Sequence, residues 1–160
     1  MLTILTEEPN IIDDAKITLQ VKSRIAMEKG IPLDAINLKT SSGVVFLTGI
    51  LNSQEQASAI VKIAASIPEV KDVNTSDLEI RENNQPLVDI YITAKVKGVF
   101  LREKLFGDKE VSAMSVSVET KDGIVYLSGA VDKKELEENA INLARQIKGV
   151  REVISSIKFK

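Results

Sequence analysis

Cysteine and histidine are both absent from the 160-residue chain. Without cysteine there can be no disulfide, no thiolate nucleophile and no cysteine-ligated zinc or iron–sulfur site. Without histidine the chain also lacks the commonest general base and the commonest ligand of transition metals. The carboxylate pairs that remain, such as Glu7-Glu8 and Glu137-Glu138, do not have the spacing of a metal-binding loop. We therefore predict a protein that is not an enzyme and that uses no cofactor or metal.

Long hydrophobic runs and an excess of basic charge are missing as well. No apolar stretch approaches the roughly 18 residues that a membrane-spanning helix needs. The 21 basic and 23 acidic side chains leave a net charge of −2, which argues against a general nucleic-acid binder. Aromatic residues make up only 4% of the chain, but the 44% hydrophobic content is typical of a folded globular domain. Residues 1–8 lack a basic segment and do not resemble a signal peptide.

The sequence is internally repeated, with the two copies offset by 80 residues over most of their length. The identical pairs include Thr40 with Thr120, Gly43 with Gly123, Val45 with Val125, Leu47 with Leu127 and Gly49 with Gly129. The first copy spans residues 13–80 and the second spans residues 88–160, after an N-terminal extension of residues 1–12. The joint over 81–87 is polar and contains a proline, as expected of a linker.

Both copies predict the same order of elements. In the first copy, apolar residues recur every fourth position over 17–25, which indicates an amphipathic helix. Alternating residues over 36–40, a short turn and β-branched residues over 44–49 indicate a β-hairpin. A second amphipathic helix over 60–67 and a last strand over 70–80 complete the copy. We predict an α+β fold of two tandem αββαβ domains, each a three-stranded sheet with two helices packed on one face.

Three details refine this expectation. Asp13 or Asp14, and Asp89 in the second copy, stand where helix N-caps are expected. The last strands align only with a slip of one residue, so that Leu78 matches Ile157, which predicts a bulge or a shorter loop. The second copy also holds extra residues between Leu101 and Ala113.

The chain resembles the BON domain, a family of bacterial osmotically inducible and nodulation-related proteins. The residues that carry the resemblance are the hairpin 122–131, the segment 144–153, their counterparts in the first copy, and the opening 89–97. Tandem BON proteins occur in the periplasm and at the outer membrane, where the family is associated with binding anionic phospholipid and with envelope integrity. The resemblance therefore implies an envelope or periplasmic location, although the chain has neither a signal peptide nor a lipidation cysteine. In the lipoprotein members, lipid contact is attributed to the first helix of the second domain.

That helix has the residues of a lipid-binding surface. Between Ile90 and Phe106 the balance of basic and acidic side chains is positive, opposite in sign to that of the whole chain. Tyr91, Lys95, Gly98 and Arg102 share one stripe of the helix, and an aromatic ring beside long cationic side chains suits a lipid headgroup zone. The predicted lipid-binding residues are Tyr91, Lys95, Lys97, Arg102, Lys104, Leu101 and Phe106.

The expected binding is weak and reversible. The net cationic charge supplies about 3 kcal/mol at an anionic surface, and partial insertion of Tyr91 and a neighbour adds about 2 to 3 kcal/mol. The matching stripe of the first copy has no aromatic residue, so the second copy is the predicted lipid-binding one. Two alternatives stay open. In the first alternative, Tyr91 packs against the neighbouring domain, and the protein is a protein-interaction or structural module with an envelope protein partner. In the second alternative, a small ion or ligand binds between the domains.

Overall fold

The computed structural model of the protein describes residues 11–81, 87–105 and 116–159. The first domain contains α1 (Ile11–Ala26), a 3-10 turn (Leu33–Ala35), β1 (Ile36–Ser41), β2 (Val44–Leu51), α2 (Gln54–Ala65) and β3 (Asp72–Ile80). The second domain contains α3 (Val88–Arg102), β5 (Val116–Lys121), β6 (Ile124–Val131), α4 (Lys134–Arg145) and β7 (Glu152–Phe159).

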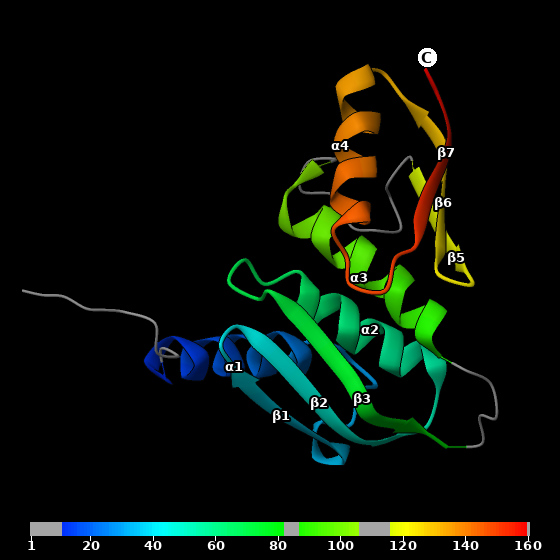
Figure 1. The fold of residues 1–160 in the computed structure, drawn as a ribbon. Coiled ribbons are helices and arrows are strands. Elements are labelled where there is room, and N and C mark those ends of the chain that lie inside the picture. The colour runs from blue at the N-terminus through cyan, green and yellow to red at the C-terminus, as the bar shows by residue number, and fades with distance from the viewer. Residues whose placement is uncertain (1–10, 82–86, 106–115, 160) are drawn as a thin grey trace, which may run out of the picture.

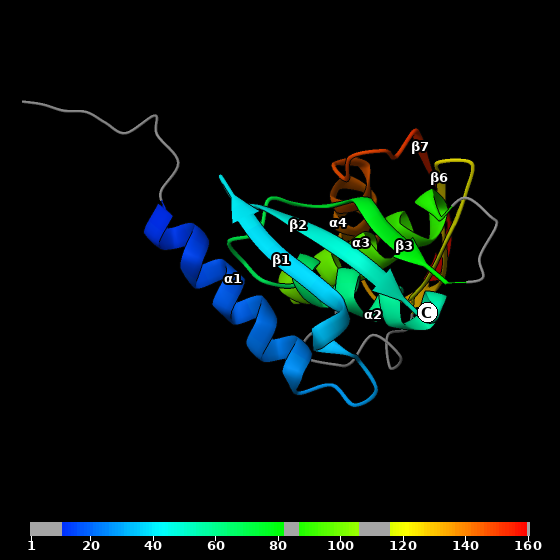
Figure 2. The same cartoon turned by 90° about the horizontal axis from the view of Figure 1, so that it is seen from below.

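Each domain is a three-stranded sheet with two helices on one face (Figures 1 and 2). The first two strands of each sheet form an antiparallel hairpin, and the third strand pairs in parallel with the second. The parallel pairing follows from the helix that crosses between the second and third strands, since parallel neighbours need such a crossover. The predicted α+β fold of two tandem αββαβ domains is confirmed.

The two hairpin turns have the backbone geometry that their sequences predict. Ser42 and Gly43 have φ angles of 51° and 84°, and Asp122 and Gly123 have 54° and 81°. Two successive positive φ angles define the turn type whose twist matches that of the strands, and glycine and aspartate tolerate this region best. The glycine shared by both repeats is therefore required by the turn.

Asp14 and Asp89 bind these turns, and the prediction that they are helix N-caps is wrong. The carboxylate oxygens of Asp14 accept hydrogen bonds from the backbone N–H groups of Ser42 and Gly43, at 2.9 and 3.0 Å. Asp89 accepts the equivalent pair from the second turn at 2.8 and 2.9 Å. The N-cap of α3 is Leu87, and Asp89 lies within the first turn of the helix. Each carboxylate thus fixes the first helix of its domain to the tip of the hairpin.

The one-residue slip between the repeats is a β-bulge in the first domain. Pairing between β2 and β3 shifts register between Phe46 and Thr48. Pairing between β6 and β7 runs without a shift from Ile124 to Val131. One strand of the first domain therefore accommodates an extra residue that the second domain lacks, as the sequence alignment predicts.

The hydrophobic core of the first domain extends into the second. Side chains from α1, α2 and the first sheet form one cluster, and Tyr91 and Ala94 of α3 belong to it. Ile92, Val96 and Phe100, on another face of α3, belong to the core of the second domain. Helix α3 therefore lies between the two domains, with one face in each core (Figure 1).

Candidate functional site

The predicted lipid-binding stripe of α3 is the surface that packs against α2. The contact between α2 and α3 is the most extensive helix–helix contact within the described part of the chain. Gly98 lies in this contact, where the Cβ atom of any other residue would lie 2.5 Å from the carbonyl oxygen of Lys62 and 2.7 Å from the Cβ of Ala65. Only glycine allows the two helix backbones to approach this closely.

Tyr91 is buried in this interface. Its side chain is 7% exposed and packs with the core of the first domain. The phenol oxygen has no hydrogen-bond partner among the described residues, and burial raises the pKa of Tyr91 above its ordinary value. The expectation that Tyr91 lies at the tip of an exposed stripe is therefore wrong, and packing against the neighbouring domain holds instead. The physical reason is that Ala94 and Gly98, on the same face of α3, are small enough to let α2 pack closely. Burial of the Tyr91 ring in this contact is then more favourable in free energy than its exposure to solvent.

Two of the predicted basic residues hold the same interface together. The Nζ atom of Lys95 lies 3.0 Å from the Oδ1 atom of Asp72, which belongs to β3 of the first domain. Arg102 donates from Nη1 to the carbonyl oxygen of Val70 at 3.3 Å and from Nε to Glu103 at 2.8 Å. Both side chains are therefore engaged by protein groups and are not free to meet a membrane.

The other predicted residues lie on a different face of α3 or outside the described residues. Lys97 and Leu101 are four residues apart on α3, which places them in one stripe, and Lys104 follows the end of the helix at Arg102. Lys97 and Leu101 are half-buried and Lys104, in the turn after the helix, is exposed. Phe106 lies outside the described residues, as does most of the predicted insertion before Ala113.

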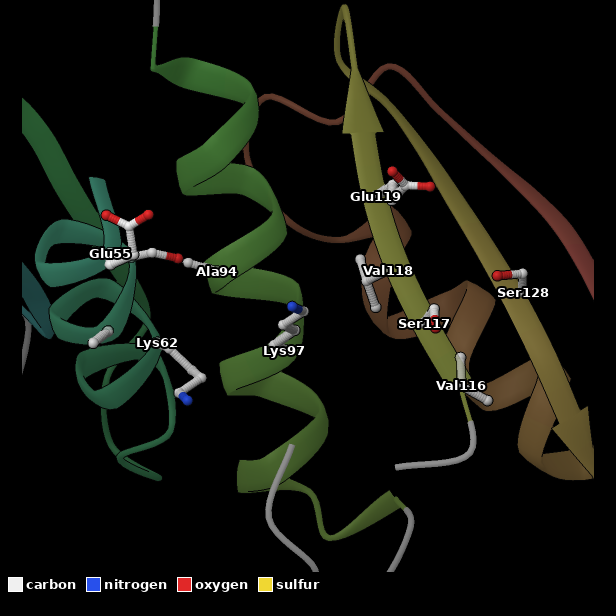
Figure 3. Close-up of a pocket in the computed structure, with 11 residues that line it drawn as sticks. Glu55, Lys62, Ala94, Lys97, Val116, Ser117, Val118, Glu119 and Ser128 are labelled. Atoms are coloured by element: carbon white, nitrogen blue, oxygen red, sulfur yellow. The ribbon is translucent and has the colours of Figure 1, made fainter. Parts of the chain in front are cut away.

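A groove runs beside this stripe, between the two domains. Its volume is about 770 Å³, and it is lined by α2 on one side, by α3 along its base and by β5 on the other side (Figure 3). The charged residues that line it are Glu55, Lys62, Lys97 and Glu119, and the hydroxyl residues are Ser58, Ser117 and Ser128.

Sequence reasoning selects only Lys97 among the charged residues of this groove. Glu55 and Lys62 lie on α2, and Glu119 lies on β5, so the three come from elements that meet only when the domains pack. Each alone is an ordinary surface charge in the sequence. No pattern within a single copy identifies them.

Replacing Tyr91 with phenylalanine should leave the stability unchanged at neutral pH or raise it by up to about 1 kcal/mol, because an unpartnered buried hydroxyl is removed. The raised pKa means that the folded state keeps the phenol proton more tightly than the unfolded state does. The protonated phenol therefore contributes to the free energy of unfolding. This contribution is complete below about pH 10 and is lost as the pH rises further through the pKa of the folded state. The wild-type protein should therefore lose stability relative to Tyr91→Phe above about pH 10.

Urea denaturation at neutral pH and at alkaline pH measures the difference. Tyr126→Phe is the matched control, since Tyr126 lies on the exposed face of the second sheet with 40% of its surface accessible. A wild-type protein that tracks Tyr91→Phe at all pH values contradicts the assignment of a buried phenol.

None of the helices in the described residues is long and apolar enough to cross a membrane. Among the same residues there is also no cluster of three or more acidic side chains arranged to hold a metal ion. The described site thus consists of an interdomain interface, a stripe on α3 and a groove.

Comparison with known proteins agrees with this architecture. The family model of the BON domain matches residues 13–82 and again residues 89–160. The chain is 34% identical over 151 residues to osmotically inducible protein Y of Escherichia coli, covering 94% of this chain and 75% of that protein. It is 32% identical over 154 residues to outer membrane lipoprotein DolP of Haemophilus influenzae, covering 92% and 75%.

A solved structure is also similar. The C-terminal domain of CdsD, a structural protein of the type III secretion system of Chlamydia trachomatis, aligns with a TM-score of 0.37 at 14% identity. That alignment covers 92% of this chain and 67% of the other. The double match to the family model and the two relatives above 30% identity show that the chain belongs to the BON-domain family, with two BON domains in tandem.

Proposed function

We propose that this chain is a non-enzymatic protein of the bacterial envelope that supports envelope integrity or osmotic-stress tolerance. The proposal is supported by its relatives, since one is named for osmotic induction and another as an outer membrane lipoprotein. The absence of histidine and cysteine from the sequence further supports a role in binding over one in catalysis.

The second part of the proposal is peripheral binding of anionic phospholipid through the first helix of the second BON domain. The observation that carries it is the stripe of Lys97 and Leu101 on α3 together with Lys104 in the turn that follows the helix, because these residues reach solvent while α2 covers another face of α3. A half-buried leucine between two lysines suits a headgroup zone, because the lysine stems can lie along apolar surface while their ammonium groups stay in water.

The structure lowers the affinity expected for this contact. Tyr91, Lys95 and Arg102 are engaged within the protein, so we count only Lys97 and Lys104, which reach solvent, as membrane-facing cations. Two lysines contribute about 2 kcal/mol at an anionic surface, and partial insertion of Leu101 adds about 1 kcal/mol. A total of about 3 kcal/mol corresponds to a dissociation constant above roughly 1 mM. Stable attachment therefore requires several copies or a separate anchor.

Vesicle co-sedimentation tests the proposal. Vesicles rich in phosphatidylglycerol should sediment the protein at low salt, and high salt or pure phosphatidylcholine should release it, because the contact is electrostatic. The double variant Lys97→Gln and Lys104→Gln should reduce binding by at least about fivefold. The matched control removes the same charge elsewhere, with Lys16→Gln and Lys39→Gln on exposed surfaces of the first domain.

Two results would overturn this part of the proposal. One is equal sedimentation with anionic and zwitterionic vesicles. The other is a control variant that loses as much binding as the double variant on α3.

A second candidate function is structural, in which the tandem is a rigid spacer or docking unit for an envelope protein partner. The observation in its favour is the interface itself, where Tyr91, Lys95, Gly98 and Arg102 all join one domain to the other. A protein that binds no vesicle composition but remains a single rigid body in solution supports this second function over the first.

A further inference from the structure

The outer edge of the second sheet is open along β7. The strand order is β5-β6-β7, so β7 is an edge strand that pairs with β6 alone. This pairing has no register shift over its whole length, and β7 contains no proline. Among the described residues, no backbone group outside the sheet bonds to β7. A long and regular edge strand can pair with a strand of another molecule, and many proteins interrupt such edges.

The backbone groups that point away from β6 belong to the odd-numbered residues of β7. The residues that flank a two-residue hairpin turn bond each other, so Ile124 directs its backbone groups to β5 and Val125 directs its own to β7. Val125 lies beside Val153 in the parallel register and therefore bonds to the residues on either side of it. This leaves the N–H and C=O groups of residues 153, 155 and 157 pointing outward. In agreement, the N–H of Ile157 donates at 3.3 Å to the hydroxyl of Ser155.

The charges at the two ends of β7 have no ion-pair partner among the described residues. Glu152 and Lys158 are both exposed, and neither belongs to an ion pair in this part of the chain. They lie six residues apart in a strand, which separates them by about 20 Å, so they cannot pair with each other. The strand is, however, complementary in charge to a second copy of itself that runs in the opposite direction.

We propose that two copies of this chain pair through β7 in an antiparallel contact with twofold symmetry. With Ser155 of both copies at the twofold axis, Glu152 of each copy lies opposite Lys158 of the other. Val153 then lies opposite Ile157 of the second copy, and these residues have the outward-pointing backbone groups that exchange hydrogen bonds in such a pair. The two opposite-charge pairs lie on the sheet face away from the helices, where directly opposed side chains stabilise a strand pair. The contact joins two three-stranded sheets into one.

The corresponding edge of the first domain, along β3, is interrupted. Its pairing with β2 shifts register between Phe46 and Thr48, and the N–H of Ser76 donates to the side chain of Asn74 at 3.0 Å. The three charged side chains of β3 are all acidic, so an antiparallel pair of β3 strands would have no opposite charge to place beside them. Of the two equivalent edges, β7 is therefore the one that combines a regular backbone with charges of both signs.

A contact of this symmetry closes at two copies, because it uses the same edge of both. The twofold axis is perpendicular to the sheet, so the helices of both copies lie on one side of the joined sheet. The dimer thus carries two copies of α3 on that side, which provides the multivalency that firm membrane attachment requires. The dimer itself does not depend on lipid binding, and it is tested without lipid.

Sedimentation velocity tests the proposal over a protein concentration series from about 1 μM to about 1 mM, which spans micromolar to millimolar dissociation constants. The protein should change from monomer to dimer as its concentration rises. Over the same series, hydrogen exchange at the amides of Val153 and Ser155 should slow, whereas exchange at the amides of Glu152 and Ile154, which bond to β6, should stay unchanged. A protein that remains monomeric over the whole series overturns the proposal, and the edge is then open to an extended segment of a different protein.

Charge reversal tests the register of the contact. Glu152→Lys places lysine opposite lysine in both pairs and should weaken dimerisation at least about tenfold, since like charges directly opposite each other destabilise a strand pair. The double variant Glu152→Lys and Lys158→Glu exchanges the two charges and should restore the wild-type dissociation constant. Glu79→Lys, the same change at an exposed position of β3, is the matched control and should have no effect. Failure of the double variant to restore the dimer overturns the antiparallel pairing.

Proline tests the backbone part of the contact. Ser155→Pro removes an outward-pointing N–H at the twofold axis and leaves the bonds to β6 intact, because an edge strand tolerates proline at such a position. It should abolish dimerisation. Ser155→Ala is its control, since it removes the same hydroxyl, with its 2.7 Å hydrogen bond to Glu137, but keeps the N–H. Urea denaturation shows whether each variant is folded. A folded Ser155→Pro protein that dimerises as the wild type does excludes β7 as the contact.

Discussion

Replacing Gly98 with leucine should separate the two BON domains. The Cβ alone would lie 2.5 Å from the carbonyl oxygen of Lys62, and a backbone atom in a helix cannot move aside as a flexible side chain can. Leucine has nearly the helix propensity of alanine, so the change tests the contact and not the helix. Overpacking of this kind costs about 1 to 3 kcal/mol when the surroundings adjust, and here the adjustment is loss of the α2–α3 contact.

The expected result is a larger radius of gyration by small-angle X-ray scattering and two unfolding transitions in place of one. The groove between the domains should be lost with the interface. Ser23→Leu is the matched control, because Ser23 is the equivalent position in α1 and is exposed. A Gly98→Leu protein with the wild-type radius and a single transition at the wild-type midpoint would show that the interface is not held at this glycine.

Replacing Asp14 with alanine should give the other large loss of stability. The carboxylate is 8% exposed and accepts two backbone hydrogen bonds from the hairpin turn of its domain. Hydrogen bonds to charged groups contribute about 1.5 to 3 kcal/mol each, and their loss leaves the two turn amides without acceptors. We expect a loss of about 3 kcal/mol, which for a chain of this length lowers the melting temperature by about 6 to 12 °C.

Thermal and urea denaturation measure this effect, with Glu28→Ala as the control for removal of one exposed negative charge from the same region. Asp89→Ala should cost less than Asp14→Ala, because the turn amide of Asp122 that Asp89 binds is exposed. Equal melting temperatures for Asp14→Ala and Glu28→Ala would contradict a structural role for the carboxylate.

The elements of each domain could be predicted because they depend on local patterns. The turn glycines, Gly43 and Gly123, stand between strands in which apolar and polar residues alternate. Because the sequence is repeated, each element is predicted independently in both copies. The roles of Asp14 and Asp89 could not be predicted in this way, because their partners lie 28 or more residues away on the hairpin. An aspartate near a helix start has the same local sequence whether it caps the helix or binds a distant turn.

The candidate site could not be predicted in the same way, because it depends on a contact between the two domains and local sequence patterns do not reveal such contacts. Helix α3 has two buried stripes, and only the stripe of Ile92, Val96 and Phe100 is apolar enough to be recognised as core. The other stripe contains Lys95 and Arg102, whose charges are satisfied by Asp72 and by a carbonyl group of the first domain. Gly98 is the residue that could have indicated the contact, because a glycine in the middle of a helix lowers its stability unless something packs closely there.

The close approach at Gly98 also bears on whether another molecule could stack on this one in the same way. A contact in which the third helix of a chain packs on its second is head-to-tail, and a repeated head-to-tail contact would extend into a filament. To continue it, α1 of another molecule would have to pack on α4, but Ser23 stands in place of Gly98 and Arg145 in place of Ala65. The added side-chain atoms at both positions obstruct this packing, so the α2–α3 contact within one molecule is not repeated between molecules.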